Sequence, residues 1–100
     1  MKKILIILSM LIALNVYAGS KKLRNGAVAM WQDQTEFIQY NSYRVVISLS
    51  DKCDYNVYGS VSLGGQSKNF FIHAGETSGY VDFGGLENGR RYSVSVQINN

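Results

Sequence analysis

Apolar and polar residues alternate along three segments of this chain. The segments are Tyr43–Ser50, Tyr55–Leu63 and Tyr92–Ile98, with Val46 as the one apolar residue out of phase. A period of two is typical of a β-strand that buries one face and exposes the other to water. The pattern therefore predicts three antiparallel strands that share one core.

Shorter runs predict additional strands. They are Gly26–Trp31, Asn69–His73, Ser78–Phe83 and, as either a short strand or a helical turn, Thr35–Tyr40. Glycine-rich links separate the runs, including a four-residue link at Gly64–Ser67. Strands at this close, regular spacing are typical of a sandwich or small barrel. We therefore predict an all-β domain over residues 26–100, a small antiparallel β-sandwich of about six or seven strands.

The first eighteen residues have the organisation of a secretory signal peptide. Lys2 and Lys3 precede an apolar run from Ile4 to Leu14, and Val16–Ala18 has the small-x-small pattern of a cleavage site. The apolar run is shorter than the roughly 20 residues that a membrane-spanning helix needs. We predict that this signal helix is removed and that a mature chain beginning at Gly19 reaches the periplasm or the exterior of a bacterium.

Removal of this segment changes the charge balance. The full chain carries +3, but Lys2 and Lys3 are two of its ten basic residues. Residues 19–100 therefore hold eight basic and seven acidic side chains, a net charge of +1, which gives no argument for nucleic-acid binding. Residues 19–25 are polar and contain a basic cluster, so we predict a mobile N-terminal tail there.

One local pattern is more specific than alternation. Leu86 is followed by a tight turn at Gly89 and, six residues after the leucine, by Tyr92 at the start of an alternating run. The pattern resembles the E–F corner of fibronectin type III and other immunoglobulin-like domains, whose tyrosine hydroxyl bonds back to nearby backbone. The resemblance implies an immunoglobulin-like sandwich with structural roles for these three residues. It departs from the family at Asn88, where a proline is usual.

The end of the sequence is a second departure from that family. A further strand normally follows the tyrosine strand, whereas this sequence ends at Asn100. Two arrangements remain open on this reasoning. Either an N-terminal strand closes that edge of the sandwich, or the strands are connected differently, as in a transthyretin-like sandwich.

The sequence contains no recognisable catalytic or metal-binding motif. His73 is the only histidine and Cys53 the only cysteine, and neither lies in a spacing typical of a metal site or a nucleophile. We therefore predict a protein that is not an enzyme and that uses no cofactor or metal. Cys53 lies in a predicted turn and is a candidate for an intermolecular disulfide, with a quiet, partly buried thiol as the alternative.

Tyr58 and Tyr80 are candidate recognition residues. Both fall on predicted outer faces among serine and asparagine, which suits an adaptable binding surface and equally suits ordinary cross-strand pairs. We predict a secreted or periplasmic, non-catalytic binding module for a protein or glycan, not membrane-spanning once cleaved. The alternatives are a structural subunit of an extracellular fibre or surface assembly, and a small secreted toxin or enzyme. Self-association would use an open sheet edge or Cys53.

Overall fold

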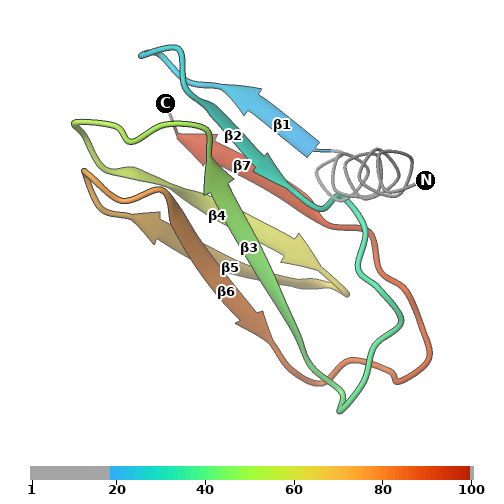
Figure 1. Cartoon of the computed structure of the whole chain (residues 1–100). Helices are drawn as coiled ribbons and strands as arrows, with labels where there is room; N and C mark the ends of the chain where they lie inside the picture. Colours follow the sequence, from blue (N-terminus) through green and yellow to red (C-terminus); the bar gives the residue numbers. More distant parts are fainter. Residues whose placement is uncertain (1–18, 100) are drawn as a thin grey trace, which may run out of the picture.

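A computed structural model describes residues 19–99 and consists of two β-sheets packed face to face (Figure 1). All strand pairs within these residues are antiparallel, and no helix is present among them. The strands are β1 (Gly19–Lys22), β2 (Val28–Trp31), β3 (Tyr43–Leu49), β4 (Val57–Leu63), β5 (Gln66–Ile72), β6 (Ser78–Phe83) and β7 (Ser95–Asn99). The predicted all-β class is confirmed. The predicted signal helix lies outside the described residues.

The strand order is β1-β2-β3-β6 in one sheet and β5-β4-β7 in the other. The chain crosses from the first sheet to the second after β3, returns after β5, and crosses again after β6. The second and third crossings each place a new strand beside one formed earlier: β6 pairs with β3, and β7 pairs with β4. The three crossings connect the two layers that enclose the core.

The alternation in the sequence decides which side chains enter that core. On β3, β4 and β6 the predicted inner positions are buried except Tyr43, which is half-buried at the start of β3. Val46, out of phase, is exposed on the outer face. The buried inner residues of these strands are Val45, Ile47, Leu49, Val57, Val61, Leu63, Val81 and Phe83. Full burial of one such side chain stabilises the fold by roughly 1.5–3 kcal/mol. The core therefore lies between the sheets and leaves their outer faces free for other uses.

The expected N-terminal tail is wrong. Gly19–Lys22 forms β1, which pairs with β2 in the register Gly19↔Trp31 to Lys22↔Val28. Leu23, directly after the strand, is buried, and the Lys21 ammonium donates a hydrogen bond to the Ile98 carbonyl at 3.0 Å. Polar and charged side chains suit an edge strand as well as a tail, so composition did not separate the two.

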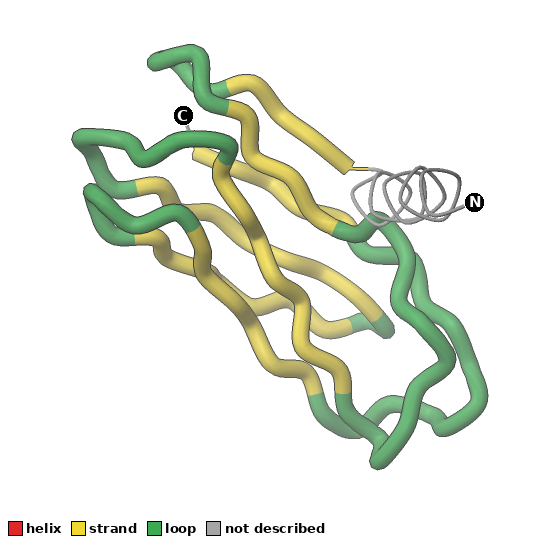
Figure 2. The backbone as a smooth tube through the Cα atoms, viewed as in Figure 1, coloured by secondary structure: helices red, strands yellow, loops and turns green. Residues whose placement is uncertain are grey.

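Residues 32–42 form neither a strand nor a helical turn, contrary to both expectations for Thr35–Tyr40. They are a long loop that runs beside the segment leading into β7 (Figure 2). Backbone hydrogen bonds hold the two together, from Thr35 N to Tyr92 O at 2.9 Å and from Ile38 N to Arg90 O at 3.0 Å. Thr35 and Ile38 are buried. Ile38 therefore anchors this loop in the core and is not part of a strand.

The link between β4 and β5 is shorter than predicted. Only Gly64 and Gly65 connect the strands, both with positive φ, and β5 begins at Gln66. Two residues with positive φ make a type I′ turn, whose twist matches the twist of a two-stranded hairpin. The tight turn fixes the register from Leu63↔Gln66 to Val57↔Ile72. It therefore determines which side chains of β5 stand beside those of β4.

The segment before β7 forms a tight corner. Leu86 is buried, and the Tyr92 hydroxyl accepts a hydrogen bond from the Glu87 backbone N–H at 3.0 Å. Gly89 has a φ of 78° and donates its N–H to the Ile38 carbonyl at 2.9 Å. A left-handed backbone is costly for residues with a Cβ, which explains the glycine. The corner thus ties β7 to the preceding turn and to the 32–42 loop.

At Gly59 the backbones of β4 and β7 leave no room for a side chain. Gly59 lies opposite Ile98, and a Cβ added to it would stand 1.9 Å from the Gln97 carbonyl oxygen. The obstacle is backbone, so no rotation of a side chain can relieve it. The two strands can therefore pair in this register only with glycine at position 59.

We expect Gly59→Ala to destabilise the protein by about 1–3 kcal/mol, because β7 must move away from β4 to admit the methyl group. Urea denaturation followed by tryptophan fluorescence measures the change. The matched control is Gly84→Ala, where an added Cβ meets nothing within 4 Å. Equal stability of the two variants would show that the strands do not meet at Gly59 as described.

Candidate functional site

An aromatic row crosses the outer face of the three-stranded sheet. Tyr58 of β4 stands between Phe71 of β5 and Asn99 of β7 in the strand register. The two rings are 48% and 47% exposed, with centroids 6.3 Å apart and planes inclined by 22°. The His73 ring packs edge-on against Phe71, at 4.7 Å between centroids. The row therefore presents a half-exposed apolar surface with an amide at one end.

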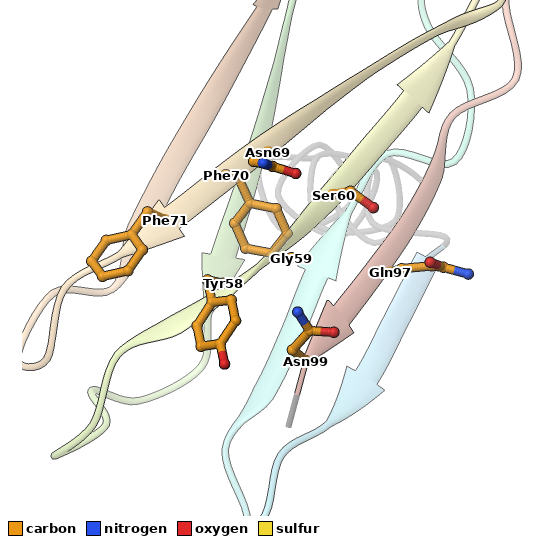
Figure 3. Close-up of a pocket in the computed structure, with 8 residues that line it drawn as sticks. All are labelled: Tyr58, Gly59, Ser60, Asn69, Phe70, Phe71, Gln97 and Asn99. Atoms are coloured by element: carbon orange, nitrogen blue, oxygen red, sulfur yellow. The ribbon is translucent and has the colours of Figure 1, made fainter.

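The next row is polar, and its middle residue is half-buried between two exposed ones. Ser60 of β4 lies between Asn69 of β5 and Gln97 of β7. The small serine in the middle leaves space beside the Tyr58 ring, and a hollow of about 600 Å³ lies over this part of the sheet (Figure 3). Its lining combines aromatic rings, a hydroxyl and amides from three strands. The sequence pattern alone could not show this, because the neighbours of Ser60 depend on register.

The outward positions of this sheet carry no charge. A third row, Ser67–Ser62–Ser95, continues the pattern, with the Ser62 and Ser67 hydroxyls 3.2 Å apart. We call the three rows together the β4 face. It consists of Tyr58, Ser60, Ser62, Ser67, Asn69, Phe71, Ser95, Gln97 and Asn99. Protein surfaces normally intersperse charges of both signs, so nine neighbouring neutral positions are a distinct feature of this one.

A second hollow, of about 340 Å³, continues the first beyond the aromatic row. It shares Tyr58 and Asn99 with the first hollow and adds Arg24, Tyr55 and Asn56. The Arg24 guanidinium lies 3.8 Å above the centre of the Tyr55 ring, a cation–π contact. Burial raises the pKa of Tyr55, with the adjacent Cys53 as a further cause. The phenol is therefore neutral at physiological pH, and Arg24 supplies the charge at this end.

Tyr80, the other predicted recognition residue, lies on the opposite sheet. It is 58% exposed on β6, but the Arg44 guanidinium covers its ring at 3.9 Å. Arg44 also donates two hydrogen bonds to Asp82, at 2.7 and 3.0 Å, and lowers the pKa of that carboxyl. Tyr58 and Tyr80 therefore belong to different faces of the sandwich. Only Tyr58 stands beside a hollow lined by neutral groups.

Cys53, the candidate for an intermolecular disulfide, is a buried free thiol. The side chain is 3% exposed within the core, and its sulfur accepts a hydrogen bond from Asn25 Nδ2 at 3.2 Å. A bridge to another chain would require the local structure to open first. This position agrees with the alternative prediction, an unreactive buried thiol.

The remaining candidates for chemistry are dispersed. His73 lies at the end of β5 against Phe71, and Asp82 is held by Arg44. Within residues 19–99, no three histidine, cysteine, aspartate or glutamate side chains gather in a group that could hold a metal ion. The same part of the chain has no helix of the length and apolarity needed to cross a membrane.

A second exposed aromatic group, which sequence reasoning missed, lies in the 32–42 loop. Phe37 and Tyr40 are 60% and 88% exposed, and Tyr40 has a φ of 58°. The Arg91 guanidinium stands 4.3 Å above the Phe37 ring and covers part of it. Neither the weak apolar pattern of this loop nor its composition distinguishes these two rings from core residues. The loop offers aromatic surface without the ordered rows of the β4 face.

Comparisons with protein-family models, with curated proteins and with solved structures found no match for this chain.

Proposed function

We propose that the protein is a small, exported, non-catalytic binding module and that the β4 face is its recognition surface. The observation that carries this proposal is the coincidence of two half-exposed rings, a hollow and nine uncharged positions on one face. Exposed apolar surface bordered by polar groups is typical of binding sites, and recessed surface more so. Export is inferred from the signal pattern of residues 1–18.

The rigid position of these groups supports recognition. Tyr58 and Ser60 lie on β4, the central strand, which is hydrogen-bonded to β5 on one side and β7 on the other. Side chains on a central strand are displayed at fixed spacing, so little conformational freedom is lost when a ligand binds. Tyrosine with serine and asparagine supplies contact area and adaptable hydrogen bonds at low entropic cost.

We infer that the sandwich is of the immunoglobulin-like type. Two observations support this: the chain returns so that β6 lies beside β3 and β7 beside β4, and Tyr92 bonds to the corner backbone before β7. Antiparallel sheets joined by connections of this kind, with a tyrosine at the corner, are features of that class.

A second candidate function, a subunit of a fibre or surface assembly, is favoured by one observation. β7 is an edge strand, so one side of its backbone has no partner strand among the described residues. Such an edge can accept a strand from another chain. The Lys21 ammonium on the Ile98 carbonyl opposes this, because it places a charge over the edge.

We expect Tyr92→Phe to lower the free energy of unfolding by about 1 kcal/mol, because the Glu87 N–H loses its acceptor. Urea denaturation measures the change, and Tyr80→Phe is the control, since no hydrogen bond of that exposed hydroxyl orders a turn. Unchanged stability of the Tyr92 variant would remove the corner as an argument for the immunoglobulin-like type.

The binding role is tested on arrays of glycans and of extracellular proteins, probed with the chain from Gly19 onwards. We expect at least one class of ligand to be retained, and Tyr58→Ala to weaken that binding about tenfold or more, a loss of roughly 1.4 kcal/mol. Tyr80→Ala, on the opposite sheet, should bind as wild type. Binding that depends on Tyr80 and not on Tyr58 would contradict the proposal, because it would place the recognition surface on the four-stranded sheet.

The assembly role is tested by sedimentation of the same chain at rising concentration. A strand-accepting edge predicts association that Lys21→Ala strengthens, because the substitution uncovers the Ile98 carbonyl. A monomer at every concentration, for both wild type and variant, would contradict this second function.

A further inference from the structure

We propose that the ligand of the β4 face is an uncharged oligosaccharide, bound with one sugar ring against Tyr58 and Phe71 and its hydroxyls on the neighbouring amides. This inference rests on the proposed binding function and names the chemical class of its ligand. Three features of the face carry it: its lack of charge, its hydrogen-bonding groups and the paired backbone of β4.

The lack of charge excludes strongly ionic ligands from the centre of the face. A charged group that loses water on binding needs a compensating charge, because its desolvation costs several kcal/mol. None of the nine outward positions of the three strands offers one. A neutral polyhydroxylated molecule carries no such penalty and matches the face in charge.

The hydrogen-bonding groups suit hydroxyls. Asn69, Gln97 and Asn99 each present an amide with donors and an acceptor, and Ser60 adds a hydroxyl that can do either. Sugar hydroxyls also donate and accept, so every one of these groups can be satisfied without proton transfer or charge. Neighbouring strands lie about 4.8 Å apart, so a row across three strands extends for about 10 Å. A row of that length can follow linked sugar rings.

The aromatic row supplies the apolar contact that hydroxyls cannot. One face of a sugar ring carries mainly C–H groups, which pack against an aromatic ring. Tyr58 and Phe71 are about half exposed and nearly parallel, and they border the hollow. The contact removes apolar area of both partners from water. It also fixes the orientation of the sugar, so that its edge hydroxyls point toward the amide row.

The paired backbone of β4 argues against an extended peptide at the centre of the face. A peptide that adds to a sheet as a further strand does so through the free backbone groups of an edge strand. The centre of the hollow lies over β4, whose backbone already pairs with β5 and β7. A ligand over β4 therefore meets only side chains. The second hollow extends the first past Tyr58 and Asn99 toward Arg24, so the whole site is elongated, as a chain-shaped ligand requires.

The test is isothermal titration calorimetry of the chain from Gly19 onwards with neutral oligosaccharides, using cellohexaose, maltohexaose and fully N-acetylated chitohexaose as probes. We expect one of them to bind with an affinity that changes less than about twofold between about 50 mM and 500 mM NaCl, because no ion pair is formed. Tyr58→Ala should weaken binding about tenfold or more. Ser60→Leu, which fills the hollow, should abolish it.

The matched control for the filled hollow is Ser78→Leu, the same change on an exposed position of β6 on the opposite sheet. It should bind as wild type, and thermal unfolding of both variants shows whether each is folded. If Ser60→Leu does not fold, Tyr58→Ala and Asn69→Ala carry the test.

Three results overturn the proposal, and they separate it from the binding function. If no neutral oligosaccharide binds while a protein binds in a Tyr58-dependent manner, the ligand class is wrong and the binding function stands. If binding falls steeply with salt and requires Arg24, the ligand is an anion. If nothing in the glycan or protein arrays binds in a Tyr58-dependent manner, both the ligand class and the binding function fail.

Discussion

The register of β4 between β5 and β7 is the constraint on which both the core and the candidate site depend. The glycine turn at 64–65 sets the pairing with β5, and the close approach at Gly59 sets the pairing with β7. Because side chains alternate along a strand, a slip of one residue would turn the whole apolar set outward. The same slip would bury Tyr58 and Ser60. The register of β4 thus determines both which side chains enter the core and which side chains form the outer face.

The same strand, β4, therefore supplies side chains to the core and to the outer face. Val57, Gly59 and Val61 face the opposite sheet, while Tyr58 and Ser60 face solvent between side chains of two other strands. Burial of the core side chains is the main source of the free energy that holds the outer groups in place. The β4 face can then be uncharged and partly apolar while the fold is maintained by the inner face. The opposite outer face differs, since Arg44 there covers an aromatic ring and pairs with Asp82.

The alternation of apolar and polar residues predicted the strands whose inner and outer side chains differ strongly in polarity, and it located Tyr58 on an outer face. The pattern failed where other forces decide the structure. β1 is polar on both sides and is ordered by backbone pairing and by Leu23, and the 32–42 loop is held by hydrogen bonds to a distant segment. Burial of Cys53 follows from how loops pack, which a local pattern does not encode. The hollow was also beyond prediction, because Asn69 and Gln97 approach Ser60 only through pairings across the sheet.

We propose above that the outer face of the β5-β4-β7 sheet recognises a ligand. Amide chemical-shift mapping during titration with the tightest-binding neutral oligosaccharide tests it most directly, since each residue reports separately. We expect the largest shifts on Tyr58, Ser60, Asn69 and Gln97, with β3 and β6 unchanged. Shifts concentrated on the outer face of β3 and β6, or on the 32–42 loop, would contradict it.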